Sequence, residues 1–276
     1  MRDRACVSNN AMILITGATD GIGLETARQL ALEGHELVLH GRTEDKVQRA
    51  RSEIALSAPQ AKLHTVHADL ADLHAVARMA DDLNARLHHL DVLINNAGVY
   101  LTEHKLSKDG FEMTMAVNHL AHFLLTQRLL PLLKKSSDPR VVTVSSMVHS
   151  SGRLNFDNLH DSGHYDDYQA YADSKLANCL FALELARRET WLSSNSLHPG
   201  VIGTKLLHAA FSIPGSDVSE GARTPVFLAE SPEIKGVSGK YFYACHITTT
   251  APSVNDPQLA QQLWHWSEQA VEQGTL

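Results

Sequence analysis

Short apolar segments of strand length alternate with longer segments of helical period along most of the chain. Between the apolar runs, residues such as Leu24, Ala27, Leu30 and Ala31 recur three and four positions apart, as on one face of a helix. Strands that alternate with helices pair in parallel, and the helices then cover both faces of the sheet. The sequence therefore predicts an α/β fold, a doubly wound parallel sheet of about seven strands flanked by helices. The predicted strands are 12–16, 36–40, 62–67, 91–95, 140–145, 192–198 and a weaker one near 240–243.

Length, composition and charge narrow the possible functions. A chain of 276 residues with 43% apolar residues can bury one large core, so we expect a single domain over 1–276 that begins with a short polar extension, 1–11. A formal net charge of −7 disfavours a nucleic-acid-binding surface. Three widely spaced cysteines predict no disulfide framework, and no apolar run is long enough to predict a membrane span. We expect a cytoplasmic protein whose partners are small molecules or proteins.

A glycine-rich segment, TGATDGIG at 16–23, lies between the first strand and the first helix. At this position backbone N–H groups and the helix N-terminus can bind a pyrophosphate, and side chains would block its approach. An ordinary turn followed by tight helix packing is the alternative for an isolated match. Further parts of the pattern follow at other strand ends, so we predict a dinucleotide site of the Rossmann type. The predicted cofactor contacts in this segment are Gly17, Thr19, Asp20, Gly21, Ile22 and Gly23.

The end of the second strand predicts which dinucleotide binds. A site specific for NAD places an acid here on the ribose 2′-hydroxyl, but this chain has Gly41 and Arg42. Gly41 leaves room for a 2′-phosphate, and Arg42 can pair with that phosphate through a bidentate fork. These two residues favour NADP (NADPH) over NAD. The alternative is that Arg42 is a solvated loop cation.

The third and fourth strands end in residues that suit contacts with adenine and ribose. Asp69 and Leu70 follow the third strand, and Asn95, Asn96, Ala97 and Gly98 end the fourth. Asp69 has a second possible role, because an aspartate often caps a helix and one begins near Asp72. The sequence leaves both roles of Asp69 open.

Tyr171 and Lys175 lie four residues apart, so in a helix they share one face a single turn apart. A free tyrosine has a pKa of about 10, and a neighbouring cation lowers it by stabilising the phenolate. The pair therefore predicts an acid/base group that works near neutral pH. Amphipathicity of a surface helix is the alternative explanation of this spacing alone.

Together these motifs resemble the short-chain dehydrogenase/reductase family in order and spacing, from about residue 12 to 243. The motifs are the glycine loop, Asn95-Asn96-Ala97-Gly98, Val144-Ser145-Ser146, Tyr171 to Lys175 and Pro199-Gly200. The glycine spacing is that of the single-domain branch. VNHLAHFLLT at 117–126, SSMVHSSGRLNF at 145–156 and LW at 263–264 resemble the retinol-dehydrogenase-like or protochlorophyllide-reductase-like branch.

The resemblance implies roles for individual residues. Tyr171 is the general acid/base, Lys175 its electrostatic partner and ribose ligand, and Ser146 polarises the carbonyl. Asn118 holds a water through its amide. Ser145 lies near the nicotinamide, although a register shift of one residue would exchange it with Ser146. The resemblance also implies cofactor contacts from Asn118, Tyr171, Lys175, Pro199, Gly200, Val201 and Thr204.

The predicted function is NADP-dependent hydride transfer to or from a carbonyl or secondary alcohol. Alternatives are an NADP-binding sensor or scaffold without turnover, and reduction of a carbon–carbon double bond. The separation of Ser146 from Tyr171 is longer than in the commonest members of the family that the chain resembles, which indicates an inserted loop at 150–167 beside the pocket. Pocket residues are predicted from three loops, and they suit an apolar ring ketone or retinoid-like aldehyde. They are Tyr100, Met147, Phe156, Leu206, Leu207 and Phe211.

Two further predictions concern metals and assembly. The chain has 17 histidines, but their spacings match no ligand motif, so no metal site is predicted. The absence of a Gly-x-Ser-x-Gly elbow disfavours a hydrolase. Family members usually associate through the helices that correspond to 107–135 and 168–190, so a homodimer or homotetramer is expected.

Overall fold

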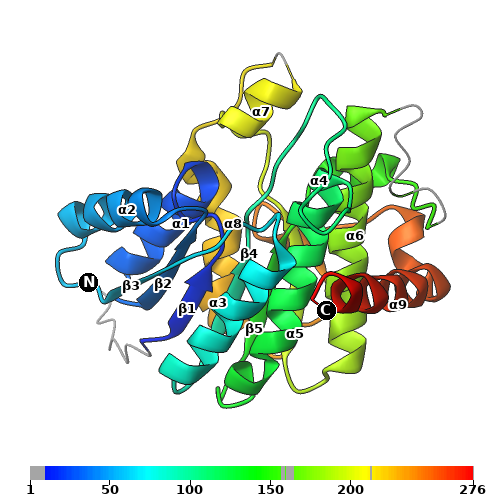
Figure 1. Ribbon diagram of the computed structural model, residues 1–276. Helices are drawn as coiled ribbons and strands as arrows, with labels where there is room; N and C mark the ends of the chain where they lie inside the picture. Colours follow the sequence, from blue (N-terminus) through cyan, green and yellow to red (C-terminus); the bar gives the residue numbers. More distant parts are fainter. Residues whose placement is uncertain (1–9, 157–158, 160–164, 212, 276) are drawn as a thin grey trace.

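The computed structural model describes residues 10–156, 159, 165–211 and 213–275. Within this part of the chain, eight strands form one sheet in the order β3-β2-β1-β4-β5-β6-β7-β8 (Figure 1). Neighbours from β3 to β7 pair in parallel, and β8 is antiparallel to β7. The strands are β1 Met12–Ile15, β2 Glu36–Gly41, β3 Leu63–His67, β4 Val92–Asn95, β5 Arg140–Val144, β6 Ser193–His198, β7 Tyr241–Tyr243 and β8 His246–Ile247.

Helices cover both faces of the sheet. α1, α2 and α8 pack on one face, and α3, α5 and α6 pack on the other. A π-helical turn, η1, joins α4 to α5. The helices are α1 Gly21–Leu32, α2 Glu44–Ser57, α3 Leu73–Arg86, α4 Met113–Met115, η1 Ala116–Leu120, α5 Ala121–Leu133, α6 Asp167–Arg188, α7 Lys205–Ala210, α8 Val218–Glu230 and α9 Pro257–Gln273, with short 3₁₀ turns η2 Met147–Ser151, η3 Pro232–Ile234 and η4 Pro252–Asn255.

Strand β1 is apolar at every position because both of its faces are covered. In β1, Ile13 and Ile15 join the core beneath α1, α2 and α8, and Leu14 joins the core beneath α3, α5 and α6. All three side chains are fully buried. None of the helices that the structure describes is long and apolar enough to cross a membrane.

The predicted fold is confirmed, and the strand ends differ from the predicted ones by no more than about one residue. The prediction omitted β8, so the sheet has one more strand than the seven apolar runs indicated. Only two residues form β8, and both are exposed, so it leaves no hydrophobic signal. A tight turn at Ala244 and Cys245 returns the chain from β7, and both residues have positive φ angles, 48° and 66°.

The strand order positions the site. The chain passes from β3 on one side of β1 to β4 on its other side, so the connections diverge between β1 and β4. Ligands of doubly wound sheets bind at such a point, beyond the carboxyl ends of the strands. The loops after β1, β4, β5 and β6 meet at this edge of the sheet, which therefore gathers the predicted motifs.

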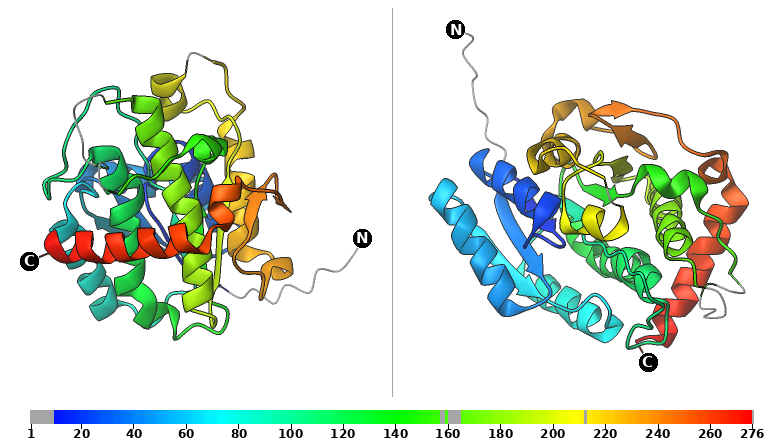
Figure 2. Two further views of the ribbon diagram at one scale, coloured as in Figure 1. Left: turned by 90° about the vertical axis from the view of Figure 1, so that its right-hand side faces the viewer. Right: turned by 90° about the horizontal axis from the view of Figure 1, so that it is seen from above.

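The C-terminal helix α9 crosses the outer sides of α5 and α6 (Figure 2). Trp264 is buried there, with its ring centre 5.0 Å from that of Phe123 and 6.1 Å from that of Phe181. The Arg188 guanidinium lies 4.5 Å from the centre of the same ring. The helices expected to mediate assembly are therefore partly covered by the chain's own C-terminal segment.

Replacing Trp264 with alanine should lower the free energy of unfolding by about 3–5 kcal/mol, because it removes a ring enclosed by two aromatic side chains. Urea unfolding followed by circular dichroism measures this. Gln261→Ala, at an exposed position of the same helix, is the control and should change little. Equal stability of the two variants would show that α9 is only loosely docked.

Candidate active site

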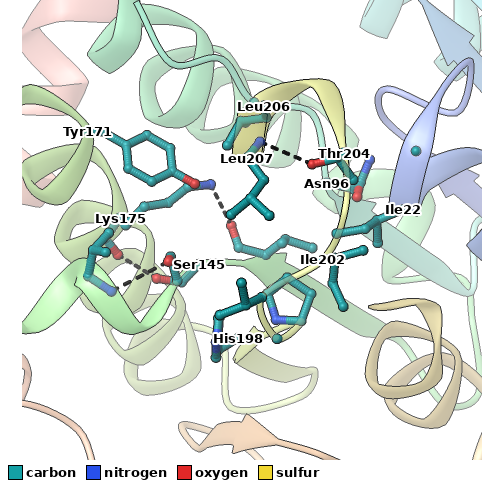
Figure 3. A pocket seen from close by; sticks show the side chains of 18 of the residues that line it. Ile22, Asn96, Ser145, Tyr171, Lys175, His198, Ile202, Thr204, Leu206 and Leu207 are labelled. Carbon is teal, nitrogen blue, oxygen red and sulfur yellow. Dashed lines mark hydrogen bonds between the residues drawn. The ribbon is translucent and has the colours of Figure 1, made fainter. Parts of the chain in front are cut away.

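A cavity of about 610 Å³ opens at the carboxyl ends of the central strands (Figure 3). Its walls come from the glycine loop, the loops after β4, β5 and β6, helix α6 and helix α7. Most of the predicted site residues line it. They are Gly17, Thr19, Asp20, Gly21, Ile22, Gly23, Asn96, Ala97, Gly98, Ser146, Tyr171, Lys175, Pro199, Gly200, Val201 and Thr204.

The glycine loop needs its glycines for two different reasons. Gly17 has a φ of 65°, a backbone conformation that side chains disfavour. At Gly23, a Cβ atom would lie 2.3 Å from the Gly17 carbonyl oxygen and 2.4 Å from Nδ2 of Asn96. Helix α1 begins directly on the cavity, so its unpaired N–H groups and its dipole favour an anion there.

Asp20 has two roles in this structure. Its carboxylate caps α1 by accepting from the Gly21 N–H at 2.9 Å. It also forms an ion pair with the ammonium of Lys205 on α7. Both residues line the cavity. The pair is exposed, so it contributes little to stability, but it links the two sides of the opening.

Helix α6 presents Tyr171 and Lys175 to the cavity one turn apart, as predicted. Lys175 Nζ lies 5.5 Å from the centre of the Tyr171 ring and donates to the Val144 carbonyl at 3.1 Å. Ser146, the residue before η2, is close enough to bond to the Tyr171 hydroxyl and so to oppose the effect of burial on its pKa. The structure therefore brings Tyr171, Ser146 and Lys175 together.

The pKa of Tyr171 differs from the sequence-based prediction, in which the neighbouring cation lowers it. Burial raises the pKa of Tyr171 well above its ordinary value, and the bond to Ser146 lowers it only in part. Burial also lowers the pKa of Lys175 to about 8. The Lys175 ammonium donates to the Val144 carbonyl. In this arrangement the phenol is protonated at neutral pH.

The two serines after β5 face different surroundings. The Ser145 hydroxyl is buried, donates to the Lys175 carbonyl at 2.7 Å and accepts from Cys179 Sγ at 3.2 Å. Both serines line the cavity, but the Ser145 hydroxyl is committed to the backbone of α6. Ser146 is therefore the serine whose hydroxyl faces the cavity, in line with the predicted register.

Asn118 does not line the cavity. It lies on the π-helical turn η1, fully buried, and its Oδ1 accepts from the Val99 N–H at 2.8 Å. Its Nδ2 donates to the Val99 carbonyl and to Ser174 Oγ, both at 3.0 Å. Both amide donors are thus used inside the protein, whereas the prediction placed a water on this amide.

Five other predicted cofactor contacts lie away from the cavity. A Cβ atom at Gly41 would lie 2.5 Å from Thr19 Cγ2, so this glycine lets the glycine loop pack against β2. Arg42 is exposed, and its side chain has no hydrogen-bond or ion-pair partner in the described part of the chain. The others are Asp69, Leu70 and Asn95.

Each of these three residues is buried in the core or hydrogen-bonded within the protein. Leu70 is buried in the core, and Asn95 Nδ2 donates to Thr126 Oγ1 at 3.0 Å. Asp69 accepts from the Ala71 N–H at 3.0 Å. The alternative that Asp69 caps the following helix is wrong, because Asp72 caps α3 by accepting from the Ala75 N–H.

The apolar part of the cavity contains residues predicted from the loops and some that were not. The predicted Met147, Leu206, Leu207 and Phe211 line it, and the Tyr100 ring packs edge-on against Tyr171 at 5.4 Å. Phe156 packs on Trp266 instead. The residues missed by the prediction are Val148, Ser150, Tyr168, His198, Ile202, Lys205 and Ile213.

His198 is the missed residue with the strongest signal, because it directly precedes Pro199-Gly200 at the end of β6. It is buried, and its ring stacks on Tyr243 at 5.3 Å. Burial lowers its pKa to about 4, so the ring is neutral at physiological pH. From the sequence, histidines are considered only as metal ligands, so no prediction is made for His198.

A family model described as short chain dehydrogenase matches residues 11–213. The chain belongs to the short-chain dehydrogenase family. Retinol dehydrogenase 14 from Homo sapiens is 38% identical to it over 291 aligned residues, which cover 94% of this chain and 85% of that protein. The expected retinol-dehydrogenase-like resemblance is therefore confirmed.

Solved structures of this family have the same fold as the present dehydrogenase. A protein from Mycobacterium paratuberculosis gives a TM-score of 0.79 at 35% identity, over 95% of this chain and 93% of that one. A short chain dehydrogenase from Shigella flexneri 2a, complexed with NADP, gives a TM-score of 0.71 at 28% identity, over 86% and 98% of the two chains.

Substituting Gly23 by alanine should lower the free energy of unfolding by about 1–3 kcal/mol, because the new methyl group would overlap the Gly17 carbonyl. Gly98→Ala is the matched control, since the nearest atom to its Cβ, Asn118 Oδ1, lies at 3.4 Å. Chemical denaturation compares the two variants. If both were as stable as the unaltered protein, the close packing of Gly23 on Gly17 would not describe the loop in solution.

Proposed function

We propose that this dehydrogenase transfers hydride between NADP and the carbonyl or secondary alcohol carbon of a small apolar substrate, with Tyr171 as proton donor and acceptor. The observation that carries the proposal is the meeting of Tyr171, Ser146 and Lys175 in one cavity with the glycine loop. The family establishes an oxidoreductase; the cofactor and the substrate class are our proposal.

The residues of the cavity fit a dinucleotide. The start of α1 offers free N–H groups to a pyrophosphate, and the absence of side chains at Gly17, Gly21 and Gly23 leaves it an approach. Thr19, Asn96 and Gly98 would line the path of the cofactor, and Arg42 would hold the 2′-phosphate. The related Shigella flexneri structure complexed with NADP supports this assignment. When bound, the nicotinamide supplies or takes up the hydride.

The chain's own groups supply proton transfer and charge stabilisation. Ser146 and Tyr171 hydroxyls both donate to the substrate oxygen, where negative charge grows as the carbonyl is reduced. Burial keeps the Tyr171 phenol protonated and ready to donate. After donation, the Lys175 ammonium lies one turn away and stabilises the phenolate. Asn118 acts by holding Val99 and Ser174 in place.

The substrate class is proposed from the apolar residues of the cavity. Met147, Leu206, Leu207, Phe211 and Ile213 give it an apolar wall. Such a wall selects a ring ketone or an extended apolar aldehyde by burial of hydrocarbon surface. The similarity to retinol dehydrogenase 14 supports a ligand of this class. No observation favours a sensor without turnover.

Assembly and location stay predictions. If the expected homodimer or homotetramer forms through α5 and α6, the interface must include α9, which crosses both helices (Figure 2). The cytoplasm remains the expected location.

Replacing Tyr171 with phenylalanine should lower turnover by at least about 100-fold, because it removes the proton donor, while NADPH still binds. NADPH oxidation against ketones and aldehydes of graded size measures turnover, and fluorescence titration measures binding. Tyr168→Phe is the control: this tyrosine also lines the cavity but bonds to Ser151. Full turnover in the Tyr171 variant would disprove the assigned role.

Replacing Arg42 with glutamate should raise the Kd for NADPH by at least about tenfold and change that for NADH little, because a carboxylate repels the 2′-phosphate. Isothermal titration measures both constants. Arg51→Glu, the same charge change at an exposed position of α2, is the control. Equal loss of affinity for the two cofactors would contradict the proposed phosphate contact.

A further inference from the structure

His122 is a buried histidine on α5, and its two ring nitrogens bond to two different segments of the chain. Its Nδ1 lies 3.0 Å from the Asn118 carbonyl oxygen on the π-helical turn. Its Nε2 lies 2.9 Å from Thr16 Oγ1, at the end of β1. The side chain therefore joins the start of the glycine loop to the turn that carries Asn118.

The hydrogen-bond partners determine which nitrogen carries the proton. A carbonyl oxygen only accepts, so Nδ1 is the donor to Asn118. Burial lowers the pKa of His122 to about 4, so the ring is neutral and Nε2 must accept. The Thr16 hydroxyl is the donor to that nitrogen.

The Thr16 oxygen is fully used in this arrangement. It accepts from the Asn96 N–H at 2.9 Å and from the Ala97 N–H at 3.0 Å. Its single proton faces His122 Nε2 at 2.9 Å and, at the longer distance of 3.4 Å, the Ile94 carbonyl, and the two accepted bonds leave no free lone pair for another donor. A protonated ring at His122 would present a third donor to the same oxygen. Only the neutral ring completes this set of bonds.

The bonds continue from Asn118 toward Tyr171. Asn118 Nδ2 donates to Ser174 Oγ at 3.0 Å, and Ser174 Oγ donates to the Tyr171 carbonyl at 2.8 Å. Asn118, His122 and Ser174 are each 1% exposed or less. One buried path thus runs from the Asn96–Ala97 loop through Thr16, His122, Asn118 and Ser174 to the backbone of Tyr171.

We propose that His122 is a positioning residue. It bonds to Thr16 at the start of the glycine loop and to Asn118 on the π-helical turn η1, and so holds the loop and the turn in one fixed relation. The proposal rests on the function proposed above, because it concerns the same site. His122 itself does not line the cavity, so it acts through these partners.

His119 shows what a buried histidine with a purely structural role looks like here. It lies three residues earlier, on η1, and is equally buried, at 1% exposure. Its Nε2 pairs with Ser267 Oγ of α9 at 2.7 Å, away from the cavity. His119→Phe is therefore a matched control for His122→Phe, since it changes the same side chain at the same burial.

The first test measures the free protein and does not depend on turnover. His122→Phe keeps an aromatic ring at this position and removes both bonds, so the Asn96 and Ala97 amides should exchange hydrogen at least about tenfold faster. His119→Phe should leave the exchange of these two amides unchanged. Unchanged exchange in the His122 variant, or equal acceleration in both variants, would overturn the proposal.

The second test separates the two bonds. The amide of glutamine reaches the position of Nε2 and can accept from Thr16, whereas that of asparagine reaches the position of Nδ1 and can donate to the Asn118 carbonyl. His122→Phe should raise the Kd for NADPH and lower kcat, each by about tenfold or more. His122→Gln should restore NADPH affinity more than kcat, and His122→Asn should restore kcat more than affinity.

The two tests distinguish the possible failures. If the unaltered protein turns over no carbonyl substrate while exchange at Asn96 and Ala97 still depends on His122, the proposed function fails and the positioning role holds. If turnover is normal and the His122 variants match the unaltered protein in Kd, kcat and exchange, the positioning role fails alone. A wild-type Kd and kcat in His122→Phe would also overturn it.

Discussion

The parallel pairing of β1 with β4 is the contact on which the site depends. These strands are far apart in sequence, and their pairing places Thr16 beside Asn96 and Ala97. Asn96 then fastens the glycine loop by donating to the Thr16 carbonyl at 2.7 Å. The left-handed backbone at Gly17 is held from outside the loop by these bonds, so the cavity wall is set by the sheet rather than by the loop alone.

The catalytic side of the cavity is built from buried polar groups that are paired with one another and with the backbone. Lys175 bonds to the Val144 carbonyl, Ser145 to the Lys175 carbonyl and Asn118 to both backbone groups of Val99. An unpaired buried polar group costs about 1–3 kcal/mol, so each of these bonds favours one arrangement of α6, η1 and β5. The same burial shifts the pKa values of Tyr171 and Lys175 away from their ordinary values.

Much of the fold and of the site was predictable because the signals are local. Apolar runs marked the seven parallel strands, and Tyr171 and Lys175 followed from helical spacing. Other features had no local signal. The direction of the Asn118 amide depends on Val99 and Ser174, and the close packing of Gly41 depends on Thr19. The docking of α9 depends on Phe123 and Phe181, which lie far from Trp264 in sequence.

By itself, the sequence determined the α/β fold, the position of the glycine loop and the helical spacing of Tyr171 and Lys175, because periodicity and spacing along the chain carry that information. Only the tertiary structure decided that the Ser145 hydroxyl bonds to the Lys175 carbonyl, that burial raises the pKa of the Tyr171 phenol, and that His122 joins Thr16 to Asn118. Burial and hydrogen-bond partners decide these properties, and both arise from residues that meet only when the sheet has formed.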